Sequence, residues 1–259
     1  MEEKKFKVEE IINLVSSENK EKILKGLEAV EKNINFIPPE AIEDVISSLF
    51  FIDLGDHPEM IDVKDKAIKV LSSFGRSIIP YCIKSLEETD LKAALDYARV
   101  LGEIGKDAVE PLLEEYHNSN SADARSFILY AISKIKDKHV SNAFPLVISE
   151  ASSQNNEIRD TATRTLGKLF ENLSPDDIDT IVLETVYNVL INRVSDFKSP
   201  IRAKAVRSLG KLAKGGFLNE RQKEKLKKLC NRILGEDEHF EWDRAFIVRK
   251  EAKETLKYL

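Results

Sequence analysis

Pairs of residues spaced four apart, in which five of the six side chains are cationic and one is aromatic, recur from the middle of the chain onward. The three pairs are Tyr130 with Lys134, Arg164 with Lys168, and Arg207 with Lys211. Because residues four apart share one face of a helix, each pair would present its side chains together. A surface of this kind attracts phosphates or carboxylates, so the chemistry it offers is binding.

The residue types that carry most catalysis and metal binding are few in this chain. None of the four histidines belongs to an HExxH motif, and no P-loop or dinucleotide-binding glycine pattern is present. The histidines are His57, His117, His139 and His239. Residues 235–243 crowd acidic side chains around the last histidine and Trp242, but without the ligand spacing of a known metal site. We expect no catalytic residue, no metal and no cofactor.

Composition favours a helical protein without disulfides. Glycine and proline are sparse, at 10 and 8 of 259 residues, which disfavours turn-rich folds. The two cysteines, Cys82 and Cys230, exclude a disulfide framework, and the apolar neighbours of Cys82 place it in a core. The first ten residues are charged, unlike a signal peptide, and no run approaches the roughly 18 apolar residues of a membrane span. We expect a cytoplasmic protein with no membrane partner.

An internal repeat positions the cationic pairs. Residues 158–167 and 201–210 share the pattern Ile-Arg-x-x-Ala-x-Arg-x-Leu-Gly, and residues 248–256 follow it to the leucine except for Val248 and Glu254 at the isoleucine and second arginine positions. Looser copies cover residues 63–72, 93–102 and 124–133. Successive copies lie 30 to 47 residues apart, which is the length of a helix pair with its loops.

Each copy has the periodicity of a helix. On a helical wheel Ile201, Ala205 and Leu209 form one apolar stripe, and the cations fall away from it. Other apolar segments of helix length lie between the copies, at residues 39–53, 78–88, 108–118, 140–152, 175–195 and 219–234. Serines before Pro175 and Pro200 predict two helix starts with a capping serine. No alternating β pattern appears, so the sequence predicts an all-α protein.

The pattern Ile-Arg-x-x-Ala-x-x-x-Leu-Gly in the second helix of a pair resembles the HEAT repeat, including the HEAT-like class of the phycobilisome lyases. The best matches are residues 156–169 and 199–212, and the resemblance extends over nearly the whole chain. It implies a right-handed α–α superhelix of about seven antiparallel helix pairs, with the second helices on the concave side. Residues 1–259 would form a single array, with residues 1–37 as the N-terminal capping pair.

The alignment of repeats exposes a column of small residues, which are Ser72, Gly102, Ser133, Gly167 and Gly210. A glycine inside a helix costs about 1 kcal/mol relative to alanine. Its recurrence in register predicts that a neighbouring helix approaches closely at this column.

A second column contains arginine, at Arg125, Arg159, Arg202 and Arg249. In HEAT-like arrays an aspartate about six residues upstream forms an inter-repeat ladder with this arginine. The resemblance therefore implies ladder roles for Asp196 and Asp243, whereas Ser119 and Ser153 stand before the first two arginines.

Charge is distributed unevenly along the chain. Residues 38–118 contain 17 acidic and 8 basic side chains, and residues 198–232 contain 2 acidic and 12 basic ones. In the aligned repeats the three cationic pairs occupy the same two positions of successive second helices. They predict a continuous basic ridge on the concave face, made of Tyr130, Lys134, Arg164, Lys168, Arg207 and Lys211.

Several functions fit this ridge. Our main interpretation is a non-enzymatic scaffold or adaptor that binds a protein or acidic peptide on its concave face. A nucleic-acid binder akin to the HEAT-like alkylpurine DNA glycosylases is an alternative, disfavoured by the net charge of −5 and the single aromatic residue of the ridge. A lyase or chaperone for a bilin-bearing protein rests on the resemblance alone. The HEAT-like iron hydroxylases depend on His-Glu dipeptides, which this chain lacks.

The ridge also has a simpler explanation, in which lysine and arginine only solvate a helix face. The sequence specifies neither the identity of a partner nor the oligomeric state.

Overall fold

The computed structural model describes residues 8–37, 41, 44, 58–239 and 241–259. Every regular element among these residues is a helix, as the sequence predicts. The α-helices are α1 (Val8–Val15), α2 (Lys20–Asn33), α4 (Ile61–Ser72), α5 (Ile79–Glu88), α6 (Leu91–Ile104), α7 (Val109–Asn118), α8 (Ala122–Ile132), α9 (Phe144–Glu150), α10 (Asn156–Leu169), α11 (Thr180–Arg193), α12 (Ser199–Lys214), α13 (Glu220–Leu234) and α14 (Phe246–Leu256). The helix expected over residues 39–53 lies largely outside the described residues.

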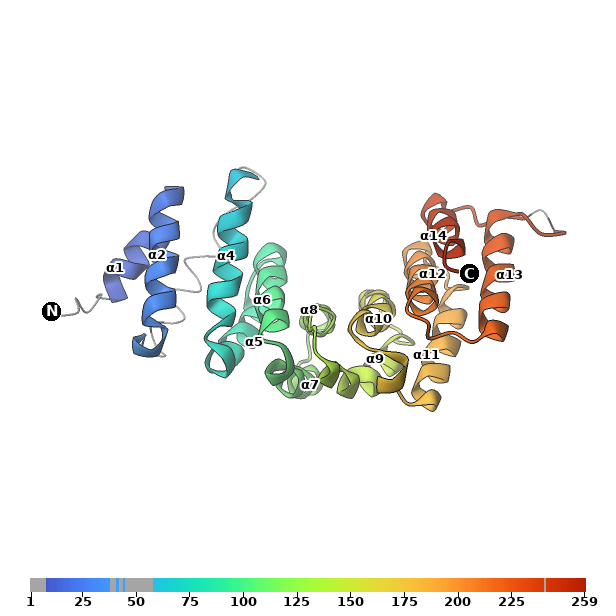
Figure 1. The fold of residues 1–259 in the computed structure, drawn as a ribbon, viewed down its shortest axis with the longest axis horizontal. Coiled ribbons are helices and arrows are strands. Elements are labelled where there is room, and N and C mark those ends of the chain that lie inside the picture. The colour runs from blue at the N-terminus through green and yellow to red at the C-terminus, as the bar shows by residue number, and fades with distance from the viewer. Residues whose placement is uncertain (1–7, 38–40, 42–43, 45–57, 240) are drawn as a thin grey trace.

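The helices pair along the chain and the pairs stack into an arc (Figure 1). Helix α1 packs on α2, α5 on α6, α7 on α8, α9 on α10, α11 on α12, and α13 on α14. The even-numbered helices from α4 to α14 line the inner side of the arc, where each contacts the next. The odd-numbered helices from α5 to α13 lie outside. This arrangement confirms a HEAT-like solenoid whose second helices face the concavity.

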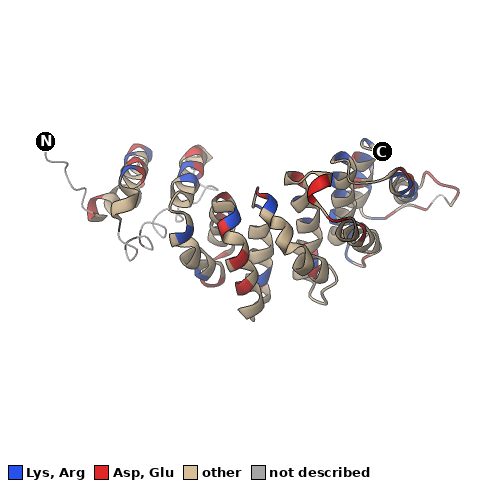
Figure 2. Ribbon diagram, turned by 60° about the horizontal axis from the view of Figure 1, so that its bottom comes forward, with Lys and Arg blue, Asp and Glu red and all other residues tan. Residues whose placement is uncertain are grey.

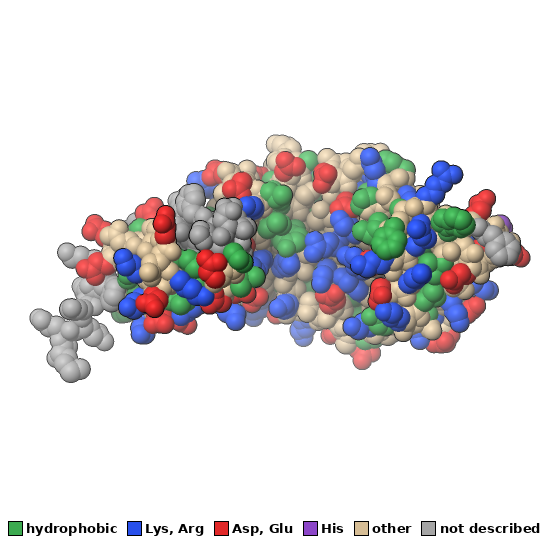
Figure 3. All heavy atoms as spheres, turned by 90° about the horizontal axis from the view of Figure 1, so that it is seen from above, with side chains coloured by type: hydrophobic (Ala, Val, Ile, Leu, Met, Phe, Trp, Pro, Cys, Tyr) green, Lys and Arg blue, Asp and Glu red, His purple; other side chains and the backbone are tan. Residues whose placement is uncertain are grey.

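One apolar core runs through all the stacked pairs, from Ile11 in α1 to Ala252 in α14. Charged residues of both signs are distributed along the whole ribbon (Figure 2). Figure 3 looks onto the concave side, where basic, acidic and apolar side chains all reach the surface. No helix of the described residues is long and apolar enough to cross a membrane.

The two predicted serine caps are wrong in detail. Ser174 forms a capping box with Asp177, but this box closes a separate 3-10 turn at Pro175–Asp177, and α11 begins only at Thr180. The cause is the extended backbone of Ile178, after which Asp179 caps α11 instead. Ser199 is already the first residue of α12 and does not cap it.

The predicted helix over residues 140–152 also begins late. A 3-10 segment at Lys138–Ala143 comes first, and α9 starts at Phe144. Its N-cap is Ala143, which offers no side chain to the free N–H groups of the first turn.

Adjacent inner helices interlock through small and hydroxyl-bearing residues. A Cβ atom on Gly167 would lie 2.4 Å from Oγ and 2.7 Å from Cα of Ser208, the hydroxyl residue of the next inner helix. A Cβ atom on Gly210 would likewise lie 2.6 Å from Oγ1 of Thr255. A Cβ atom on Gly102 would lie 2.4 Å from Cβ of Lys134, so the close approach predicted for the small-residue column is confirmed at all three of its glycines.

The same hydroxyl residues tie each inner helix to the one before it. Ser208 donates to the carbonyl oxygen of Thr163 at 3.0 Å, and Thr255 donates to that of Val206 at 3.2 Å. Thr165 in α10 donates in the same way to α8, at 3.1 Å. Each donor precedes the repeat leucine by one position, so this column recurs in register with the glycines.

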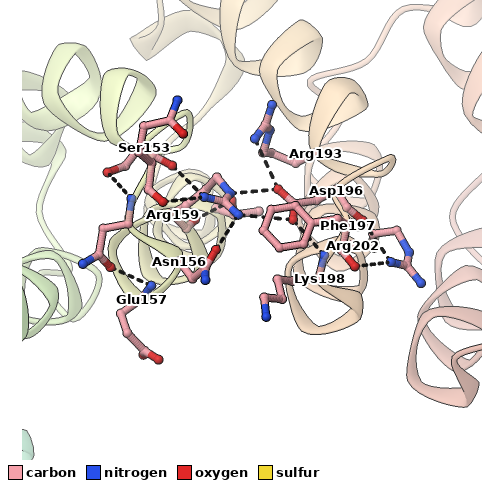
Figure 4. Close-up of polar contacts among 12 residues, drawn as sticks. Ser153, Asn156, Glu157, Arg159, Arg193, Asp196, Phe197, Lys198 and Arg202 are labelled. Carbon is pink, nitrogen blue, oxygen red and sulfur yellow. Dashed lines mark hydrogen bonds and ion pairs between the residues drawn. The ribbon is translucent and has the colours of Figure 1, made fainter.

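An arginine–aspartate ladder runs along one end of the inner helices (Figure 4). Nε of Arg159 lies 2.8 Å from Oδ2 of Asp196, and both side chains are almost fully buried. One repeat further on, Nε of Arg202 lies 2.7 Å from Oδ2 of Asp243. Each arginine also donates to a carbonyl oxygen six residues upstream in its own repeat, as Arg202 does to Asp196 at 2.9 Å.

The ladder is confirmed, but the carboxylates of Asp196 and Asp243 do not pair with the arginine six residues after them. Each aspartate bonds through its carboxylate to the arginine of the preceding repeat, so Arg159 is a full member despite the serine before it. Among the residues that the structure describes, Arg249 has just the backbone contact, to the carbonyl of Asp243. For Arg125, the repeat position that Asp196 fills for Arg159 holds Ser153, which has no carboxylate, and the Arg125 guanidinium lies over the Tyr116 ring.

The charges and hydrogen bonds of the ladder favour the ionised form of both aspartates. Burial acts to raise the pKa of Asp196, but hydrogen bonds from Arg159 and from the N–H of Lys198 outweigh it. The pKa of Asp196 is therefore held below its ordinary value near 3.8. The pKa of Asp243 is lowered in the same way, against its burial, by Arg202 and the N–H of Ala245.

Gly167→Ala tests the close helix contact. The new Cβ would overlap Cα of Ser208, which no side-chain rotation relieves, so α12 must shift. We expect a loss of about 1–3 kcal/mol in the free energy of unfolding, despite the better helix propensity of alanine. Urea unfolding measures it. Ser72→Ala, at the equivalent position of α4, is the control and should change stability little. Equal or greater stability of Gly167→Ala would disprove the contact.

Asp196→Asn tests the ladder. It leaves the buried Arg159 without its anion, and we expect a loss of about 3 kcal/mol at neutral pH. Because the folded-state pKa of Asp196 is lowered, its contribution is complete above pH 3.8 and is lost as the pH falls through the folded pKa. Urea unfolding across this range should therefore show the gap between wild type and variant closing in acid.

Asp62→Asn is the matched control for that experiment, because Asp62 pairs with Lys20 on an exposed surface. Its cost should stay within about 1 kcal/mol. Equal costs for the two variants would contradict a structural role of the ladder.

Candidate functional site

The basic ridge lies on the concave face, where α8, α10 and α12 contribute two residues each. Lys134 stands just beyond the end of α8, and the other members lie within their helices. Figure 3 shows Lys and Arg side chains gathered in the middle of this face. Arg207 is exposed and the remaining members are half-buried. The structure thus brings the six predicted residues onto one surface.

The N-terminal half of the ridge is a cation–π cluster. Nζ of Lys134 lies 4.7 Å from the centre of the Tyr130 ring, and Cζ of Arg164 lies 5.3 Å from it. Each such contact is worth about 0.5–1 kcal/mol when partly exposed. In the part of the chain that the structure describes, neither cation forms an ion pair with a carboxylate. Asp160, four residues before Arg164, pairs with Lys204 instead.

The C-terminal half of the ridge is neutralised by two acidic residues. Glu171 lies on the 3-10 turn Phe170–Asn172 directly after α10. Its carboxylate is 2.7 Å from Nζ of Lys168 and 3.0 Å from Nζ of Lys211. Arg207 forms a two-pronged contact with the buried Glu251 of α14, at 2.5 and 2.9 Å. This geometry is the strong form of the arginine–carboxylate pair.

Burial and ion pairing act in opposite directions on the pKa values of Lys211 and Glu171. Burial lowers the pKa of Lys211, Glu171 raises it, and the nearby charges of Lys168 and Arg164 lower it further. The resulting pKa of Lys211 lies below 10.5. Burial acts to raise the pKa of Glu171, but the two lysines outweigh it and the pKa is lowered. The cations of the ridge are therefore close enough to repel one another around a single carboxylate.

The other candidate residues form no comparable site. His57 lies outside the described residues. His139 contacts Asp137 at 2.6 Å, and His239 is exposed beside Asp237. Among the described residues no group of three or more His, Cys, Asp or Glu side chains could hold a metal ion.

Both cysteines are buried, as predicted for Cys82. Burial raises the pKa of the Cys82 thiol, and it raises that of Cys230 to about 12. Such thiols are not nucleophiles near neutral pH.

Sequence reasoning missed the acidic partners of the ridge. Glu251 comes from the next repeat, and Glu171 reaches Lys211 from the turn after α10, so no spacing pattern links these pairs; only the three-residue spacing of Lys168 and Glu171 could have indicated a partner. Half of the basic side chains of residues 198–232 also lie on the outer helix α13, away from the concave face.

Comparison with known proteins gives one family and several folds. The family model described as sister chromatid cohesion protein PDS5 matches residues 65–256. No curated protein sequence matches the chain.

Two solved structures show the same type of fold. The first is the complex of CpcE and CpcF of phycocyanin lyase from Nostoc sp. PCC7120, at 22% identity and a TM-score of 0.56, covering 70% of this chain and 98% of that one. The second is the designed armadillo repeat protein YIII(Dq.V1)4CPAF in complex with the peptide (KR)4, at 13% identity and a TM-score of 0.51, covering 98% and 99%. At these identities the likeness concerns the fold.

The family match spans well over half of the chain and coincides with the repeats from α4 to α14. It agrees with the HEAT-like resemblance of the sequence and with the solenoid that the structure shows. The chain therefore belongs to the family of the sister chromatid cohesion protein PDS5.

Proposed function

We propose that this protein is a non-enzymatic adaptor that binds an acidic peptide segment of a partner protein along the basic ridge. The observation that carries the proposal is the cluster of Tyr130, Lys134 and Arg164. Its two cations lie on the concave face, within reach of solvent, and are held by an aromatic ring rather than by a carboxylate. They are thus placed in advance for an anion from outside.

The charge balance of the ridge also favours an acidic partner. The ridge carries five cations, and the structure pairs them with only Glu171 and Glu251. The designed armadillo neighbour is a complex with the basic peptide (KR)4. The concave face of this chain is basic along the ridge, and a basic face favours an acidic peptide.

The reach of the ridge sets the length of the segment. Packed helices lie about 8–10 Å apart, so the distance from α8 to α12 is about 18 Å. An extended chain advances about 3.3 Å per residue, so about six residues would cover the ridge.

The proposal treats residues 1–259 as a single array with residues 1–37 as its N-terminal capping pair. The continuous apolar core supports this organisation. The non-enzymatic part rests on the chemistry of the ridge, because a lysine or arginine whose charge is engaged by a ring or by a carboxylate is suited to binding an anion rather than to acting as a base or a nucleophile.

Lys134→Glu combined with Arg164→Glu tests the proposal. Arg207 is unsuitable for reversal, because a glutamate there would face the buried Glu251. We expect the double variant to bind fluorescein-labelled decaglutamate at least about tenfold more weakly than wild type, since like charges now face the probe. Helicity and melting should be preserved, because neither residue lies in the core. Fluorescence anisotropy measures binding.

The matched control is Lys225→Glu combined with Lys227→Glu, which makes the same change in net charge on the outer helix α13. It should bind the peptide as wild type does. Equal binding by the ridge variant would contradict the proposal. Tight retention of duplex DNA, with a log–log salt slope near −0.9 per phosphate, would favour the nucleic-acid alternative.

Glu171→Gln should strengthen binding of the same probe. The carboxylate of Glu171 occupies the space between Lys168 and Lys211 that an anionic group of the partner would share. Removing its charge should tighten binding about two- to fivefold, the equivalent of one exposed ion pair. Glu220→Gln, on the outer helix α13 and paired with Lys223, is the control and should bind the probe as wild type does. Weaker binding by Glu171→Gln would show that Glu171 orders the site rather than competes for it.

A further inference from the structure

The basic ridge ends in a groove between the C-terminal ends of α12 and α14. Its volume is about 490 Å³, and it is open to the concave face. Arg207 and Lys211 belong to both the ridge and the groove, so the two surfaces are continuous. The turn after α10 closes the third side with Phe170 and Leu173.

The groove differs from the ridge in its apolar walls. Phe170 is buried, Leu173 is half-buried, and the Tyr258 ring is 40% exposed on the opposite wall. Gly210 lines the space between them without a side chain of its own. The volume falls within the range of small ligand pockets and is ample for one large side chain.

The rim of the groove carries three cations and three carboxylates. Lys214 extends over the Tyr258 ring, with Nζ 5.6 Å from its centre. Within the described residues it has no acidic partner. The acidic residues of the rim are already paired, Glu171 with the two lysines of the ridge, Glu251 with Arg207 and Glu254 with Lys257.

We propose that this groove receives one bulky apolar side chain of the acidic segment, which makes the partner an acidic peptide with an aromatic or large aliphatic anchor. The inference rests on the proposed function, because the ridge delivers the segment to the groove. An anchor in a partly apolar pocket supplies affinity that exposed charges do not, and surrounding charges fix the register of the chain. The Lys214 ammonium lies where a carboxylate beside the anchor would meet it.

Two probe peptides separate the groove from the ridge. One is a glutamate peptide with a single central phenylalanine, and the other has alanine at that position. Wild-type protein should bind the phenylalanine peptide about fivefold or more tightly than the alanine peptide, because the ring is removed from water. In Tyr258→Ala, and independently in Leu173→Ala, this preference should fall to less than about twofold, because a wall of the pocket is missing.

Trp242→Ala is the control, since this residue is an exposed aromatic outside the groove. It should keep the full preference for phenylalanine. A third peptide with benzoylphenylalanine at the anchor position should cross-link, on irradiation, to residues 170–173 or 255–258. Cross-links elsewhere on the chain would overturn the assignment of the groove.

The outcomes distinguish the two proposals. If neither peptide binds, the acidic-peptide function itself is wrong. If both bind with equal affinity, the ridge binds acidic segments and the groove inference is wrong. If the preference for phenylalanine persists in both Tyr258→Ala and Leu173→Ala, the anchor lies elsewhere and the groove inference again fails.

Discussion

The contact between a glycine in one inner helix and a hydroxyl-bearing residue in the next is the constraint on which this structure depends. At Gly167 and Gly210 the neighbouring side chain occupies the space where a Cβ atom would lie. The same hydroxyls, on Ser208 and Thr255, donate to carbonyl oxygens of the preceding helix. Since both contacts require a short interhelical distance, they fix how closely α10 approaches α12 and how closely α12 approaches α14.

That spacing gives the charged residues their partners. The arginine at the start of one inner helix reaches the aspartate before the next, and Arg159 and Asp196 are buried as a result. Further along the same helices, Arg164 reaches the Tyr130 ring of the preceding repeat, and Lys211 reaches Glu171. One repeat geometry therefore places cations in two settings. At the ladder they are buried and structural, and on the ridge they remain in contact with solvent.

The sequence predicts the fold and the face of the ridge, because both follow from local periodicity. Spacings of four residues, the repeat leucine and the column of small residues all survive in the structure. Partners across repeats are not predictable in this way. The loops between repeats vary in length, so Glu251 meets Arg207 across 44 residues and Asp196 meets Arg159 across 37. The predicted serine caps at Ser174 and Ser199 are wrong. The side chains of the nearby Asp179 and Asp196 accept hydrogen bonds from backbone N–H groups there instead.

The division of the ridge into two halves has a physical consequence for recognition. On the proposed function, a carboxylate that arrives where Tyr130 holds Lys134 and Arg164 would displace only water, so this half would contribute long-range attraction and fast encounter. Around Glu171, an incoming carboxylate must compete with one already in place, so the net gain from charge alone is small. Selectivity in that half then depends on apolar contact, and the groove beside Lys211 and Lys214 is the part of the concave face that offers it. A partner chosen by such a surface is recognised by the order in which charge and apolar bulk occur along its chain.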